Sequence, residues 1–195
     1  MPTLWKNSSS SNGPAPESPA AVLIRRLEPQ DLPAYKMLRD EALVRHPEAF
    51  TSDAETERLR SPESYLGRLG RGEPLGGTFL LGAWLGDELA GSVACDRELR
   101  PKIRHRAQIV GMYVRERYTR RGVGRLLLAA CIEQARQAAG LEMLTLSVTA
   151  SNERALLMYE RAGFRTYGLL PRAVRVEGAG GRAQYFDKAL MWMEL

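Results

Sequence analysis

The apolar residues in the first half of the chain follow a strand pattern, then a helical pattern, then a hairpin pattern. A short strand is predicted at 21–24, and a helix follows from Pro29 to Val44, with apolar residues at helical spacing. A second helix is predicted over 53–69, with an interruption at Pro62. Apolar runs on either side of a Gly-Asp turn predict a β-hairpin over 78–95.

The second half of the chain alternates strands with helices and ends in two strands joined by a glycine-rich turn at 178–181. The predicted elements are a strand, a helix, a strand, a helix and two strands, at 109–114, 122–139, 143–148, 152–162, 164–176 and 183–194. About seven strands interleaved with about four helices indicate an α/β (α+β) fold with a mixed central sheet.

Composition indicates one globular domain preceded by a polar tail. The chain has 195 residues, of which 44% are hydrophobic and 26% are charged, as in an average globular protein. Residues 1–20 are rich in serine and proline, so we expect a flexible tail there and a single domain over 21–195. The sequence lacks an apolar run of about 18 residues and the apolar core of a secretory signal. A cytoplasmic protein is therefore expected, without a membrane partner.

The cysteines and histidines predict neither a disulfide framework nor a metal site. Two cysteines are too few for a disulfide scaffold and fit a reducing compartment. Cys95, Cys131, His46 and His105 are separated by spacings that match no zinc motif. We therefore expect no metal.

The basic residues suggest an anionic ligand. The formal net charge is +5, and 24 of the 28 basic residues are arginine, which indicates either phosphate-like partners or a general preference for arginine. Five arginines fall within 115–125, where a strand is predicted to give way to a helix through Gly122 and Gly124. A dinucleotide-binding loop would need a glycine at Leu127, and the chain has no Gly-Lys-Ser/Thr loop. Two interpretations remain, a pyrophosphate cradle for a coenzyme-A-type ligand and a tight turn with solvated arginines.

Two segments resemble the motifs of the GNAT superfamily of N-acetyltransferases. Residues 110–114 followed by 119–124, with the sequence Thr-Arg-Arg-Gly-Val-Gly, resemble its acetyl-CoA motif. Residues 152–164 resemble its second motif, Asn-x-x-Ala-x-x-x-Tyr-x-x-x-Gly-Phe. The resemblance covers about 21–195 and implies a GNAT-like fold and acetyl-CoA as cosubstrate. Thr119 departs from the Gln or Arg that is usual in the family.

The resemblance also implies which residues contact the coenzyme. The strand at 109–114 would separate from the strand at 143–148, and the pantetheine arm would lie in that gap. Backbone groups of Met112 and Val114 would bind the arm as an added strand does, and a backbone N–H near Met112 would stabilise the oxyanion. Asn152 would contact the arm, although an asparagine before a helix is equally explained as an N-cap. The expected coenzyme-binding residues are Met112, Tyr113, Val114, Thr119, Arg120, Arg121, Gly122, Val123, Gly124, Arg125 and Asn152.

Two residues are expected to handle protons. Tyr159 is the candidate general acid for the leaving thiolate, and its spacing from Ala155 also fits a core aromatic residue. His105 is the candidate base because imidazole is the side-chain group best suited to exchange protons at physiological pH, although an exposed histidine in a basic loop explains it too. Carboxylates that could border the acceptor cleft, none selected by the sequence, are Glu41, Asp96 and Asp187.

The sequence thus predicts an N-acetyltransferase that moves an acetyl group from acetyl-CoA to an amine by direct attack. The acceptor could be a small amine, an amino-acid derivative, an aminoglycoside-type compound or a protein amine. A non-catalytic acyl-CoA sensor is an alternative that would not need Tyr159. A basic nucleic-acid-binding module would leave 152–164 unexplained, so we expect no nucleic acid. The chain is expected to be a monomer or a homodimer.

Overall fold

A computed structural model describes residues 21–178 and 181–195. The predicted tail at 1–20 and the middle of the predicted turn at 178–181 lie outside these residues. Seven strands form one sheet in the order β1-β2-β3-β4-β5-β7-β6, in which β4 and β5 are parallel and every other neighbouring pair is antiparallel. The strands are β1 (Val22–Arg26), β2 (Phe79–Leu85), β3 (Glu88–Arg97), β4 (Arg106–Val114), β5 (Met143–Thr149), β6 (Arg165–Glu177) and β7 (Ala183–Glu194). The predicted mixed sheet is confirmed.

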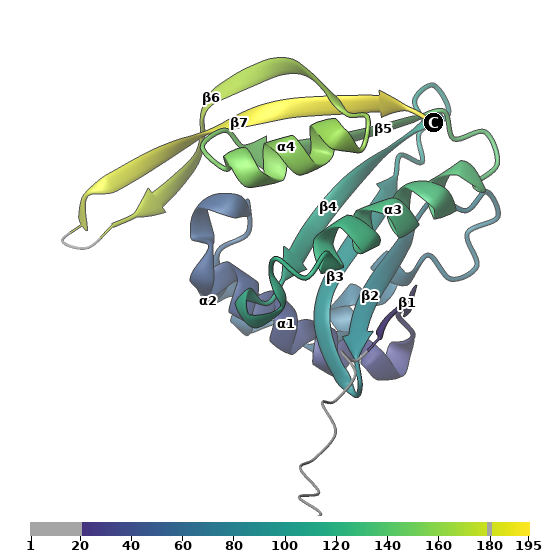
Figure 1. Ribbon diagram of the computed structural model, residues 1–195, viewed down its shortest axis with the longest axis horizontal. Helices are drawn as coiled ribbons and strands as arrows, with labels where there is room; N and C mark the ends of the chain where they lie inside the picture. Colours follow the sequence, from purple (N-terminus) through teal and green to yellow (C-terminus); the bar gives the residue numbers. More distant parts are fainter. Residues whose placement is uncertain (1–20, 179–180) are drawn as a thin grey trace, which may run out of the picture.

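Helices cover both faces of this sheet (Figure 1). The helices α3 (Val123–Arg136) and α4 (Glu153–Arg161) lie on one face, and α1 (Leu32–Arg45) lies behind the strands on the other. The remaining helix, α2 (Ala54–Arg58), follows α1. Short 3₁₀ segments connect these parts, namely η1 (Pro29–Asp31), η2 (Pro47–Ala49), η3 (Pro62–Leu69) and η4 (Glu116–Tyr118). Within the described residues no helix is long and apolar enough to cross a membrane.

Several predicted bounds shift by up to three residues, and two of the differences bear on the site. The helix predicted over 53–69 is divided into α2 and η3, because Pro62 has no backbone N–H to donate and begins a new turn instead. The strand predicted at 109–114 begins earlier, at Arg106, since residues 106–108 pair with β5. The three added residues prove important, because they are the ones that join β4 to β5.

The core has two parts, one on each face of the sheet. Leu127 and Cys131 of α3 pack with Leu144 of β5 on the α3 face. Tyr35 and Leu38 of α1 pack on the opposite face, against β2, β3 and β4. Each face of the central strands is therefore fixed independently by its own helix.

Candidate active site

The strands β4 and β5 are paired at one end and separate toward the other. Their register joins Arg106, Ala107 and Gln108 to Met143, Leu144 and Thr145, and ends there. Figure 1 shows the two strands diverging beyond this point, with α4 beside the opening. The edge of β4 from Ile109 to Val114 therefore has no β5 partner and is available to an extended ligand that binds as a strand does.

A β-bulge interrupts β4 within this unpaired half. Val93 of β3 lies opposite two residues, Gly111 and Met112, and Gly111 has a left-handed φ of 61°. The bulge shifts the alternation of side chains by one position, so that Met112 lies on the α3 face and Tyr113 on the α1 face. Met112 contacts Tyr159 of α4, whereas the Tyr113 hydroxyl donates to Glu41 Oε1 of α1 at 3.1 Å. Tyr113 can therefore reach a ligand in the gap only through its backbone.

Tyr159 faces the bulge from α4. Its side chain is buried, with 8% exposed, and its hydroxyl lies 3.4 Å from the Met112 Sδ atom. Its ring packs edge-on against Phe164, with ring centroids 5.9 Å apart. Burial raises the pKa of the Tyr159 hydroxyl above its ordinary value of about 10. The group therefore keeps its proton at neutral pH, as a general acid must.

The N-terminus of α3 lies beside the same part of β4. Gly122 precedes the helix with a φ of 80°, and Arg120 also has a left-handed φ, of 63°. Backbone in this conformation directs successive N–H groups toward an anion. A Cβ atom added at Gly124 would lie 3.5 Å from Met158 Sδ and 3.6 Å from Met112 Cε, so the first turn of α3 adjoins both α4 and the bulge.

The five arginines of 115–125 divide into two groups. Arg115 and Arg117 both donate to Glu88, which also accepts from the Tyr118 hydroxyl. Three further arginines are exposed at the start of α3, and no carboxylate of the described residues lies within salt-bridge distance of them. These are Arg120, Arg121 and Arg125. Their charge remains available to an external anion, whereas that of the first group is largely compensated inside the protein.

The remaining coenzyme-binding candidates have structural contacts of their own. The Thr119 hydroxyl donates to the Glu116 carbonyl at 2.8 Å, and the Val123 side chain is buried in the core. Asn152 Oδ1 accepts from the Ala155 N–H at 3.0 Å, so the N-cap role of Asn152 is observed. A contact between Asn152 and a ligand stays a prediction.

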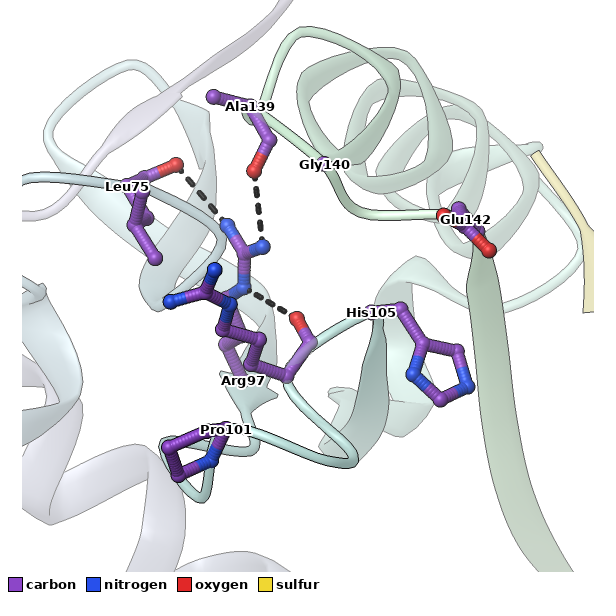
Figure 2. A pocket seen from close by; sticks show the side chains of 8 residues that line it. Leu75, Arg97, Pro101, His105, Ala139, Gly140 and Glu142 are labelled. Atoms are coloured by element: carbon purple, nitrogen blue, oxygen red, sulfur yellow. Dashed lines mark hydrogen bonds between the residues drawn. The ribbon is translucent and has the colours of Figure 1, made fainter.

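His105 lies at the other end of β4. It precedes the residues that pair with β5 and lines a cavity of about 400 Å³ beside Arg97 and Glu142 (Figure 2). The Arg97 guanidinium crosses this cavity to the carbonyls of Leu75 and Ala139, and the His105 imidazole points away from this guanidinium. Met112 lies seven positions after His105, roughly 20 Å along the strand. The structure therefore does not bring His105 together with Tyr159, and its role as base stays a prediction that this placement does not favour.

The three carboxylates left open by the sequence have different surroundings. Glu41 accepts from Tyr113 and lies 3.4 Å from Arg115 Nε. Asp187 accepts from the backbone N–H of Arg172 at 2.7 Å. Asp96, near the end of β3, is half-buried, and burial raises the pKa of its carboxyl group.

Sequence reasoning missed a polar cluster on the α1 face of the bulge. Arg68 of η3 donates from Nη1 to the Tyr35 hydroxyl at 2.8 Å, and the same nitrogen lies 3.4 Å from a Cβ atom built on Gly111. Nothing local distinguishes Arg68 from the other arginines, because its neighbours come from α1 and β4. Only the packing of η3 against the sheet identifies it.

A buried lysine on β7 was also missed. Lys188 Nζ donates to the Glu48 and Ala49 carbonyls of η2 at 3.2 and 2.7 Å, and lies 3.0 Å from Thr149 Oγ1. Burial lowers the pKa of this amine. Lys188 thus holds η2, which follows α1, against Thr149 at the end of β5 that is not paired with β4.

Comparison with known proteins identifies the family of this chain. Residues 35–164 match the model of the Acetyltransferase (GNAT) family. Mycothiol acetyltransferase of Propionibacterium freudenreichii is 31% identical over 150 residues, which are 75% of this chain and 44% of that relative, so the chain spans less than half of its length.

Solved structures agree in fold. An acetyltransferase of the GNAT family from Streptococcus pneumoniae superposes with a TM-score of 0.75 at 26% identity, over 90% of this chain and 99% of that one. The yncA protein of Salmonella typhimurium, solved with its cofactor acetyl-CoA, gives a TM-score of 0.73 at 20% identity, over 90% of this chain and 94% of that one. The chain is therefore a member of the GNAT acetyltransferase family.

Proposed function

We propose that this chain is an N-acetyltransferase that uses acetyl-CoA as acetyl donor and an amine as acceptor. The observation that carries the proposal is that three features meet at one point, namely the unpaired edge of β4, the N-terminus of α3 and the Tyr159 hydroxyl. Such a site combines an anion cradle, a binding edge for an extended arm and a proton donor. The family membership supports the same reaction.

The residues present fit the parts of acetyl-CoA. The pyrophosphate would be held by backbone N–H groups around Gly122 and Gly124 and by Arg120, Arg121 and Arg125, whose charges are uncompensated. Space is available at Gly122, because a Cβ atom added there would contact nothing within 4 Å. The pantetheine amides would pair with the open edge of β4 at Met112 and Val114. When bound, the coenzyme supplies a thioester, an acyl group on a good leaving group.

The protein groups then have defined tasks in the transfer. The β4 backbone at the bulge would donate a hydrogen bond to the oxyanion that forms at the carbonyl. Tyr159 would give its hydroxyl proton to the departing sulfur. Both groups adjoin Met112, so oxyanion stabilisation and protonation occur at the same point of the strand.

Binding of acetyl-CoA is the first test. We expect acetyl-CoA at 100 times its dissociation constant to stabilise the folded protein by about 2.7 kcal/mol, measured as a rise in the denaturant midpoint. Desulfo-coenzyme A, which retains the phosphates, should also stabilise. Single-stranded DNA of equal charge is the control, and stabilisation by DNA without stabilisation by acetyl-CoA would overturn the proposal in favour of a nucleic-acid-binding module.

Turnover is the second test, and it separates an enzyme from a sensor. Release of free thiol should accelerate in the presence of at least one member of a panel of small amines, amino-acid derivatives, aminoglycoside-type compounds and N-terminal peptides. An acceptor related to mycothiol belongs in the panel because one relative is a mycothiol acetyltransferase. Binding of acetyl-CoA without turnover of any member would favour the sensor.

A further inference from the structure

Asp96 lies on the face of the sheet opposite to Tyr159. Along β3, Ala94 packs in the α1-face core and Cys95 packs in the α3-face core, so alternation places Asp96 on the α1 face. Asp96 is in register with Gln108 of β4. Gly111, where the bulge begins, is three residues further along β4, a distance of about 10 Å. A ligand that approaches the bulge from the α1 face would therefore pass close to this carboxylate.

The Asp96 carboxylate is free to accept a proton. Among the residues that the structure describes, it has neither a side-chain hydrogen bond nor an ion pair within 4 Å, and its oxygens are not fully enclosed. Arg68 of η3 is the charged group that faces it, while its β4 neighbour Gln108 is neutral and Tyr35 of α1 reaches Arg68 instead. Burial raises the pKa of the Asp96 carboxyl group, and Arg68 opposes this rise.

The other candidates are less suited to take a proton. Glu41 is engaged by the Tyr113 hydroxyl and by two arginines, and Asp187 accepts from the Arg172 backbone. His105 lies at the paired end of β4, away from the bulge. Asp96 combines an open carboxylate, partial burial and proximity to the bulge. A base in such surroundings has its pKa moved toward the operating pH, where proton transfer is most effective.

We propose that Asp96 is the general base for the acceptor amine, reached through intervening water, and that Arg68, at the α1 face of the bulge, is the cation that faces it. This inference rests on the proposed acetyltransferase function. The acceptor ammonium gives one proton to Asp96, which passes it to solvent. The neutral amine then forms the C–N bond at the thioester carbonyl, whose oxygen becomes the oxyanion, and the C–S bond breaks as that oxygen returns to a carbonyl. The thiolate takes the Tyr159 proton, and that hydroxyl is reprotonated through solvent by the second proton of the attacking nitrogen.

Asp96→Asn tests this assignment with an amine that the wild-type protein acetylates. We expect kcat/KM to fall about 10²–10⁴-fold, with the dissociation constant for acetyl-CoA unchanged within twofold. Asp96→Glu should restore part of the activity. Glu98→Gln is the matched control, because it removes one carboxylate just beyond the same strand and should leave kcat/KM within twofold of wild type.

The pH profile distinguishes a base from a merely structural residue. In the wild type, kcat/KM should rise with pH as Asp96 loses its proton, and this limb should be absent in Asp96→Asn. Because Arg68 lowers the pKa of Asp96, Arg68→Met should move the limb to higher pH, an effect that remains measurable even if Asp96→Asn does not fold.

The inference and the proposed function fail in different ways. If wild type acetylates an amine and Asp96→Asn retains kcat/KM within twofold with an unchanged pH profile, Asp96 is not the base. An unshifted limb in Arg68→Met would also overturn the assignment. If wild type neither binds acetyl-CoA nor releases thiol, the proposed function itself is wrong.

Discussion

Tyr159 occupies a core position and also directs its hydroxyl to the bulge of β4. Its ring is packed in the α3-face core, while its hydroxyl reaches the open edge of β4 at Met112. The sequence left two interpretations of Tyr159, a core aromatic residue and a general acid, and the structure makes them compatible. Core packing fixes the ring, so the hydroxyl is held in one place without further hydrogen bonds to the protein. The burial that raises its pKa also keeps the proton on the oxygen.

Tyr159→Phe should therefore lower the rate of transfer without affecting the fold. We expect kcat to fall about 10²–10⁴-fold, measured as single-turnover thiol release, with an unchanged dissociation constant for acetyl-CoA. Tyr167→Phe, on the exposed part of β6, is the matched control. Because the pKa of Tyr159 is raised, wild type should not lose activity between pH 8 and about 10 through its ionisation. Full activity of Tyr159→Phe with chemistry rate-limiting would contradict the assignment.

The candidate site residues that could be recognised from the sequence are those that belong to local motifs. Gly122, Gly124 and Tyr159 stand at fixed spacings around a strand-to-helix turn and within one helix, so they can be recognised locally. Asp96 and Arg68 become neighbours of the bulge only through the register of β3 on β4 and the packing of η3. Such long-range register leaves no periodic signal in the sequence. Asp96 could therefore be named as one of three carboxylates near the acceptor cleft, but the sequence could not choose among them.

At the scale of elements, the arginines before and within α3 fall into a paired and an unpaired group that the sequence could not distinguish. Five arginines look equivalent in 115–125, but Arg115 and Arg117 share Glu88, which is contributed by β3. The pairing depends on the β2–β3 hairpin lying beside the strand-to-helix turn. The hairpin and most helices were predicted, because each follows a local pattern. The separation of β4 from β5 was implied by the family resemblance and not by the pattern of either strand, because it is a property of their pairing.

Removing the three uncompensated charges should weaken coenzyme binding specifically. For the triple variant Arg120→Gln, Arg121→Gln and Arg125→Gln we expect the dissociation constant for acetyl-CoA to rise about 10²-fold at low ionic strength, since each lost phosphate contact costs a few-fold in affinity. The affinity of the variant should also depend less on salt. Both quantities can be obtained from calorimetric titrations at several salt concentrations.

Arg117→Gln is the matched control for this experiment. Arg117 belongs to the same segment, but its guanidinium is paired with Glu88. Its loss should change the dissociation constant by less than about twofold. Equal effects of the control and the triple variant would mean that the phosphates are not bound by the uncompensated group.

At the scale of the whole molecule, the residues of the proposed site lie on both faces of the sheet. The N-terminus of α3, α4 and Tyr159 lie on the α3 face, whereas Arg68 and Asp96 lie on the α1 face. At the bulge, the edge of β4 is not paired with β5. Under the proposed function, donor and acceptor would enter from opposite faces and meet there, so neither has to leave before the other binds.

This arrangement requires the two parts of the sheet to be held firmly where they do join. Leu144 of β5 is in register with Ala107 of β4, and its side chain is 0% exposed. Leu144→Ala should lower the free energy of unfolding by about 2–5 kcal/mol, measured by denaturant titration. Leu157→Ala is the control, because that side chain on α4 is 45% exposed, and it should cost less than about 1 kcal/mol.

The same pair of variants tests whether the paired ends of β4 and β5 determine how far the two strands separate beyond them. When each variant is saturated at 100 times its own dissociation constant for acetyl-CoA, the ligand raises the free energy of unfolding by about 2.7 kcal/mol in every case. The stabilisation therefore does not distinguish the variants, and the dissociation constant itself must be measured. If β4 and β5 are held in place chiefly by the core around Leu144, its truncation should loosen the unpaired strands and weaken acetyl-CoA binding several-fold, while Leu157→Ala leaves affinity unchanged. If Leu144→Ala is destabilised but binds acetyl-CoA as tightly as wild type, the helices packed on the two faces of the sheet keep β4 and β5 apart without the contribution of Leu144.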